Sequence, residues 1–130
     1  NSVRALIVNT ANGKEIASAV WGYETGTVGV ILSRDPNLAR QNPADYIKGA
    51  EITIKKALAA EFARQIDHYL RTGLNTQQFG KLVLVAAPAF LGQLRENMDA
   101  QVAKSVVYEL GKNLVHCDAA EIAAHLPKYL

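Results

Sequence analysis

Short apolar runs separated by turn residues open the chain. Residues 3–9 form an apolar run that ends in Asn-Thr-Ala-Asn-Gly, which predicts a strand and then a turn at Asn12-Gly13. Residues 15–23 place their side chains alternately on two faces, and residues 27–32 form a third run. Because only short turn segments separate the runs, we expect three strands in an antiparallel meander.

A helical period replaces this pattern in the middle of the chain. Apolar residues recur every four positions and predict a long helix that begins at Ile47 or Ala50, ends at Thr72 and has Gly73 as its C-cap. The apolar face comprises Ile54, Leu58, Phe62, Ile66 and Leu70, joined by Tyr69. Before this helix, residues 33–48 are polar and predict one long loop. Long structureless loops in compact domains are commonly functional.

Strands and helices alternate in the last part of the chain. Residues 81–87 are apolar on both faces, which is typical of a parallel strand covered on both sides. For residues 106–110 a helix is the alternative to a strand. Asp118 and Glu121 have the spacing of a capping box. The expected elements are a strand at 81–87, a helix at 89–96, a helical turn capped by Asp99, a strand at 106–114 and a helix at 118–126.

This order of elements predicts a fold class. We expect a single domain over residues 1–130 with the order β-β-β-α-β-α-β-α. A meander followed by right-handed crossovers gives an α/β fold with a mixed sheet and helices on both faces. Ribonuclease H-like folds share this order, and a fold by itself implies no activity.

A ligand site in such a sheet is expected beyond the carboxyl ends of its strands. The strand order then predicts a shallow cleft formed by Asn9 and Thr10 with Pro88 and Ala89. The helix that follows Pro88 favours an anion at its N-terminus. The alternative is that Asn9 and Thr10 only begin the turn at Asn12-Gly13.

Composition narrows the function classes. There are 14 Lys and Arg residues against 12 Asp and Glu, so a large phosphate-binding surface is not expected, whereas a local basic patch remains compatible. No stretch approaches the roughly 18 apolar residues of a membrane span. The single cysteine excludes an internal disulfide and favours a reducing, cytoplasmic location.

Catalytic motifs are absent from the sequence pattern. A two-metal nuclease needs several converging carboxylates, and the predicted strands end without an acid. The three histidines lack metal-ligand spacing, and the adjacent His116 and Cys117 are poorly placed to act as a catalytic pair. A hydrolase in the predicted cleft would lack a visible acid–base pair. We therefore expect a protein that is not an enzyme and has no cofactor or metal.

One basic stretch favours binding. The candidate RNA- or partner-binding residues lie in the predicted loop and the first helical turns: Arg34, Arg40, Lys48, Lys55 and Lys56. Acidic residues of the same stretch leave it a small net positive charge: Asp35, Asp45 and Glu51. The alternative is a solvated loop. Tyr46 is the one aromatic residue of the loop, so base stacking by the loop is not expected.

Residues 81–95 carry a family resemblance. Their sequence, Lys-Leu-Val-Leu-Val-Ala-Ala-Pro-Ala-Phe-Leu-Gly-Gln-Leu-Arg, resembles the signature of the bacterial host attachment proteins, described as required for attachment to host cells. Segments 5–13, 62–66, 106–114 and 119–127 support it. That family is in turn similar to the middle domain of archaeal and eukaryotic peptide-chain release factors.

The resemblance implies a ribonuclease H-like fold and two kinds of partner. One is ribosomal RNA or tRNA, and the other is an unidentified protein involved in attachment to host cells. Release factors carry a Gly-Gly-Gln loop before the long helix, which assists hydrolysis of peptidyl-tRNA. The corresponding residues 33–50 contain Gln41 without paired glycines. The resemblance therefore predicts a binding domain that does not catalyse peptide release.

Overall fold

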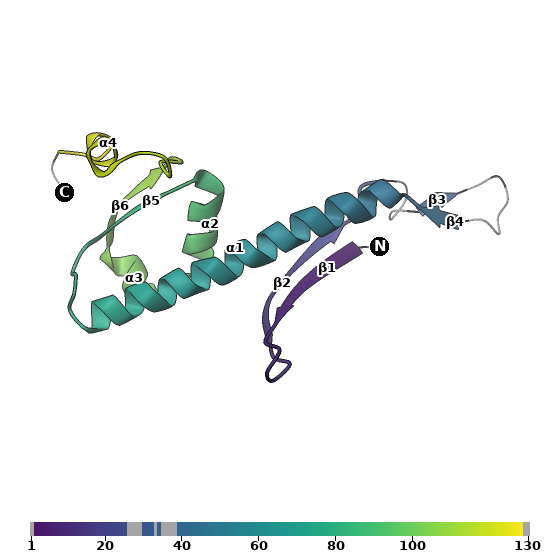
Figure 1. The fold of residues 1–130 in the computed structure, drawn as a ribbon, viewed down its shortest axis with the longest axis horizontal. Helices are drawn as coiled ribbons and strands as arrows, with labels where there is room; N and C mark the ends of the chain where they lie inside the picture. The colour runs from purple at the N-terminus through teal and green to yellow at the C-terminus, as the bar shows by residue number, and fades with distance from the viewer. Residues whose placement is uncertain (1, 26–29, 33, 35–38, 129–130) are drawn as a thin grey trace. The chain divides into compact units, whose positions relative to one another are not determined.

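Six strands and four helices form within the described residues 2–25, 30–32, 34 and 39–128 of the computed structural model (Figure 1). In chain order they are β1 (Ser2–Val8), β2 (Glu15–Gly22), β3 (Val30–Leu32), β4 (Ala39–Gln41), α1 (Pro43–Asn75), β5 (Leu82–Ala86), α2 (Pro88–Asn97), α3 (Ala100–Ser105), β6 (Val106–Gly111) and α4 (Ala119–Ala124). The chain divides into two compact units, 1–61 and 62–130, with the division inside α1. The expected single domain stays a prediction.

The first unit is built on an antiparallel ribbon of β1 and β2. Its register pairs Ser2 with Gly22 and Ile7 with Ala17. The turn that joins the strands has Gly13 at φ 69°, and the Gly13 amide donates to the Asn9 carbonyl at 2.7 Å. This left-handed conformation favours glycine, so the predicted Asn12-Gly13 turn is confirmed.

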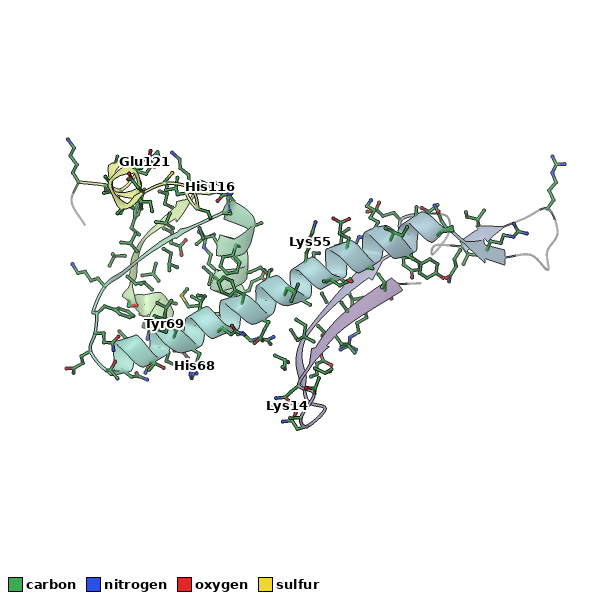
Figure 2. The ribbon with its side chains drawn as sticks, in the orientation of Figure 1. Lys14, Lys55, His68, Tyr69, His116 and Glu121 are labelled. Atoms are coloured by element: carbon green, nitrogen blue, oxygen red, sulfur yellow. The ribbon has the colours of Figure 1, made fainter. Side chains whose placement is uncertain are left out.

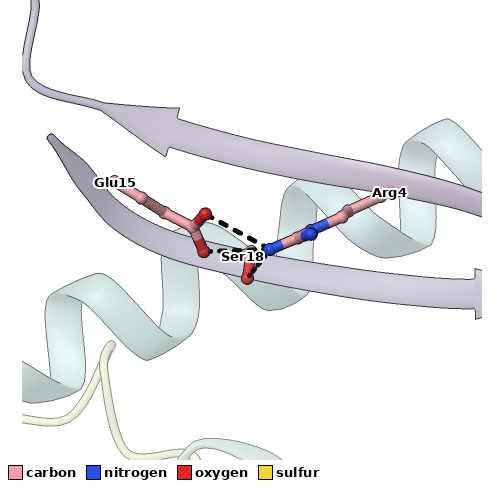
Figure 3. Close-up of polar contacts among 3 residues, drawn as sticks. All are labelled: Arg4, Glu15 and Ser18. Atoms are coloured by element: carbon pink, nitrogen blue, oxygen red, sulfur yellow. Dashed lines mark hydrogen bonds and ion pairs between the residues drawn. The ribbon is translucent and has the colours of Figure 1, made fainter. Parts of the chain in front are cut away.

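An ion pair crosses the ribbon. Arg4 Nη2 donates to both carboxylate oxygens of Glu15 at 3.2 Å and to Ser18 Oγ at 3.3 Å (Figure 3). The Arg4 and Glu15 side chains are about half exposed, so we expect the pair to add little stability. The opposite face of the ribbon packs on α1.

The third strand pairs with a different strand from the one predicted. In the described residues, β3 pairs with β4, with Ile31 opposite Arg40, and not with β2. The prediction of a three-stranded meander is therefore wrong for residues 30–32, and residues 27–29 lie outside the described residues. A strand of three residues carries too little pattern to specify its partner.

The predicted loop over 33–48 is also wrong in part. It contains β4, and α1 already begins at Pro43. Asn42 Oδ1 accepts a hydrogen bond from the Ala44 amide at 3.1 Å, and proline is favoured at the first helical position. Residues 33 and 35–38 lie outside the described residues.

Helix α1 also extends beyond its predicted end. Gly73 lies within the helix, where a Cβ atom would be 2.8 Å from Phe79 Cε1. The helix ends at Asn75, Gln77 adopts φ 57°, and the Gln78 amide donates to the Gly73 carbonyl at 2.9 Å. The predicted Gly73 cap is therefore wrong, because this glycine makes room for a ring.

The buried face of α1 in the first unit is not the predicted apolar face. Thr53 is 1% exposed and Ala57 is fully buried, whereas Ile54 and Leu58 are 51% and 56% exposed. A Cβ atom on Gly49 would clash with Val3 and lie 2.8 Å from Trp21 Cε3. Small residues thus let the ribbon approach the helix closely. The Thr53 hydroxyl is satisfied because it donates to the Gly49 carbonyl at 2.7 Å.

The second unit holds a parallel pair of strands. β5 and β6 run side by side, with Leu82 opposite Val106 and Val85 opposite Leu110, so the predicted parallel strands are confirmed. The predicted strand is thereby confirmed over Val106–Gly111, and the helical alternative for residues 106–110 is wrong. The buried apolar residues of the second unit come from the end of α1, β5, α2 and α3: Ala63, Leu84, Leu91, Leu94 and Val102.

The predicted helix caps of this unit are confirmed. Asp99 Oδ1 accepts from the Gln101 amide at 2.8 Å and begins α3. Asp118 and Glu121 form a reciprocal capping box at the start of α4. Asp67 on α1 also accepts from the Asp99 amide at 2.7 Å, which fixes α3 against α1.

The described strands form three two-stranded sheets: β1–β2, β3–β4 and β5–β6. The mixed α/β class is confirmed, β4 and a separate α3 add to the expected order, and the ribonuclease H-like arrangement stays a prediction. No helix in the described part of the chain has both the length and the hydropathy that a membrane span requires.

Candidate functional site

Three of the predicted basic residues have no ion-pair partner among the residues that the structure describes. Arg34, between β3 and β4, and Arg40, in β4, are exposed, and so is Lys56 on α1. None of the three forms an ion pair with another described residue. An exposed guanidinium or ammonium without a carboxylate neighbour can bind an anion without first losing a partner.

The other two predicted basic residues are paired. Lys48 forms an ion pair with Glu24. Lys55 Nζ lies 2.6 Å from Glu51 Oε1. The hydrogen bond and charge of Lys55 hold the pKa of Glu51 below its ordinary value. Within the described part of the chain, the predicted basic set therefore divides into two paired residues and three without an ion-pair partner.

An aromatic cluster lies beside Lys48. The ring centroids of Trp21 and Tyr23 are 6.0 Å apart, and those of Tyr23 and Tyr46 are 5.4 Å apart, both edge to face. Lys48 Nζ lies 5.6 Å from the centroid of Trp21. The alternation of Trp21 and Tyr23 at the end of a strand was the available signal, because residues two apart share one face.

Asp45 is a buried carboxylate that forms a hydrogen bond with Thr25. The side chain is 4% exposed, and its Oδ1 accepts from Thr25 Oγ1 at 2.8 Å. Thr25 in turn accepts from Asn42 Nδ2 at 3.3 Å. Asp45 Oδ2 has no hydrogen-bond partner among the described residues. The carboxylate lies in the first turn of α1, where the helix dipole favours a negative charge.

The surroundings of Tyr23 raise the pKa of its hydroxyl group. Burial raises the pKa of Tyr23, and Tyr46 and Asp45 add smaller contributions in the same direction. We expect the pKa of Tyr23 to lie above its ordinary value of 10.0. The stability that the neutral Tyr23 side chain contributes is therefore fully present below pH 10.0 and is lost as the pH rises through the pKa of the folded state. The difference in ultraviolet absorbance between the parent protein and Tyr23→Phe, followed against pH, measures the ionisation of Tyr23. Asp45→Asn should lower the Tyr23 pKa only in part, because burial remains; an ionisation at or below 10.0 in the parent would contradict the assignment.

The predicted cleft residues have separate local roles. Asn9 Oδ1 accepts from the Ala11 amide at 2.9 Å, and the Asn9 amide donates to the Lys14 carbonyl at 2.8 Å, as the alternative of a turn requires. Thr10 is exposed in the same turn. Pro88 and Ala89 are the first residues of α2. The two pairs belong to different units, so the cleft stays a prediction.

A hollow of about 600 Å³ lies in the second unit. Its lining includes strand β5 together with Ile66, Leu70 and Phe90, and Asn113 supplies a polar side chain. Phe90 also stacks on Phe62, with centroids 5.3 Å apart. The other described residues that line this hollow have apolar side chains.

In the described part of the second unit, Arg95 and Glu109 form an ion pair. Arg95, in the segment that resembles the family signature, donates to Glu109, and this hydrogen bond raises the pKa of the arginine. His68 and His116 lie on separate segments (Figure 2). Among the described residues, no group of three His, Cys, Asp or Glu side chains is placed to hold a metal ion.

Comparison with known proteins gives a family. Residues 39–126 match the family described as "Protein required for attachment to host cells". A ribulokinase from Vibrio parahaemolyticus serotype O3:K6 (strain RIMD 2210633) is 32% identical over 76 residues, which are 58% of this chain and 13% of that protein. No solved structure matches the chain. Similarity to release factors stays a prediction. Because the family match covers more than half of the sequence, the chain belongs to the family of proteins required for attachment to host cells.

Proposed function

We propose that the chain is a non-catalytic binding domain that contacts RNA through the β3–β4 ribbon and the first half of α1. The observation that carries the proposal is the exposed, unpaired charge of Arg34, Arg40 and Lys56 in the described structure. Cations of this kind bind phosphate by releasing its counterions. The small net charge of +2 fits a local contact better than an extended one.

The resemblance to release factors suggests ribosomal RNA or tRNA as the partner and the cytoplasm as the location. The same resemblance supports a ribonuclease H-like strand order as part of the proposal. The resemblance does not support the catalytic role of the Gly-Gly-Gln loop. Gln41 lies in strand β4 without the paired glycines that would give its backbone freedom. The proposal is therefore one of binding, without hydrolysis of peptidyl-tRNA.

Salt dependence of RNA binding tests the proposal. We expect Arg34→Ala/Arg40→Ala to weaken binding of a single-stranded RNA and to reduce the slope of log affinity against log salt by about 1.4, since each lost phosphate contact removes roughly 0.7. Fluorescence anisotropy at several salt concentrations measures both quantities. Sedimentation with ribosomes tests whether the same variant loses a larger partner.

A matched variant controls for net charge. Lys14 and Lys104 are exposed on other elements, so Lys14→Ala/Lys104→Ala removes two positive charges and should leave the slope unchanged. Equal losses in the two double variants, or no salt-sensitive binding by the parent protein, would show that the basic ribbon is not an RNA site.

A second candidate is a protein-interaction factor in attachment to host cells. The family description favours it, and so do three exposed apolar side chains on the β1–β2 ribbon, Leu6, Val8 and Val20, which are 51%, 47% and 57% exposed. Locating the full-length protein inside or outside the cell separates the candidates. Export would favour attachment, and retention in the cytoplasm would favour RNA.

A further inference from the structure

The face of α1 turned away from the β1–β2 ribbon is apolar and uncovered within the first unit. Ile47, Ile54 and Leu58, here named the outer stripe, are 73%, 51% and 56% exposed. Their spacings of seven and four residues place them along one side of a helix. Adjacent large apolar side chains that stay exposed mark a surface that another molecule covers.

Opposite charges border the outer stripe. Glu51 lies between Ile47 and Ile54 in the sequence, and Lys55 follows Ile54. The two form an ion pair at 2.6 Å, and their side chains remain 62% and 73% exposed. Both charges can therefore reach an incoming surface. One acid and one base, a turn apart, suit a partner with the same pair in the reverse order.

We propose that a second copy of the chain covers the outer stripe, with the two α1 helices antiparallel about a two-fold axis at the level of Thr53. With a rise of about 1.5 Å per residue, Ile54 lies next to this axis and faces the partner's Ile54. Ile47 and Leu58 lie at roughly 9 Å and 7.5 Å on opposite sides of it. Each Ile47 thus packs against the partner's Leu58.

Charge complementarity selects the second copy as the occupant. Glu51 and Lys55 are equally far from the level of Thr53, so Glu51 faces the partner's Lys55 and Lys55 faces the partner's Glu51. A two-fold interface requires a surface that complements itself in this way. The axis position that centres the three apolar residues is therefore the one that pairs the charges.

Sedimentation equilibrium of the full chain at low salt tests the proposal. We expect a dimer, and we expect Glu51→Lys or Lys55→Glu alone to raise its dissociation constant by about tenfold, because each places two like-charged pairs in the interface. The double variant Glu51→Lys/Lys55→Glu restores the opposed charges and should recover the parent constant. Lys14→Glu, a charge reversal in the β1–β2 turn, should change nothing.

An apolar variant provides a second measurement. Ile54→Lys should be monomeric with an unchanged far-ultraviolet circular dichroism spectrum and unchanged stability of the monomer. A parent protein that is monomeric at all concentrations, or a double variant that fails to recover association, would overturn the proposal. A destabilised Ile54→Lys monomer would also overturn it, since the stripe would then be covered within a single chain.

Discussion

Replacing Gly49 with alanine is expected to destabilise the protein by about 1–3 kcal/mol, although alanine is the better helix former. The added methyl group would clash with Val3 and lie 2.8 Å from Trp21 Cε3. Neither neighbour can move freely, because Val3 is held in the register of β1 and Trp21 contacts Tyr23. The helix must then move away from the ribbon and lose part of its packing.

Urea unfolding of the Gly49→Ala variant measures this loss. Gly92→Ala is the matched control, because Gly92 lies in α2 with no atom of another residue near its Cβ position. That control should stabilise the protein by about 1 kcal/mol through helix propensity alone. If both variants were stabilised, the close approach of α1 to the ribbon would be wrong.

Truncating Leu91 to alanine should have a larger effect, about 2–5 kcal/mol. Leu91 is 4% exposed on α2, and it packs close to Gly111 at the end of β6. Removing its terminal carbons leaves a cavity in the small core of the second unit, where the parallel pair and α2 meet. The lost burial and the cavity both lower the free energy of unfolding.

The conservative variant Leu91→Met separates packing from backbone effects. It retains most of the side-chain volume and should cost less than about 1.5 kcal/mol. Urea unfolding followed by circular dichroism compares the two variants. Equal losses for alanine and methionine would indicate that volume at this position does not support the core.

Part of the candidate site was readable from the sequence. Lys55 follows Glu51 by four residues on a predicted helix, and this spacing brings the two side chains together. The ion pair between Lys55 and Glu51 could therefore have been predicted. The pairing of Lys48 with Glu24 could not, since 24 residues separate them. Arg34, Arg40 and Lys56 were expected to be exposed, but only the structure separates them from their paired neighbours.

Local chemistry alone determined much of this protein. The Asn12-Gly13 turn, the Asp99 and Asp118 caps and the apolar run that forms β5 each depend on residues close together in the chain. Such features form because a glycine, a capping carboxylate or an apolar run has the same preference in most surroundings. The family signature lies in one of these segments.

Contacts between distant residues were decided only by the tertiary structure. The apolar period of α1 predicted that Ile54 and Leu58 face the core, yet Gly49, Thr53 and Ala57 do so. Periodicity reports where apolar residues lie on a helix, whereas burial depends on which face a partner can approach. Here the smaller side chains permit the closer approach, so the ribbon covers them and leaves the larger ones exposed.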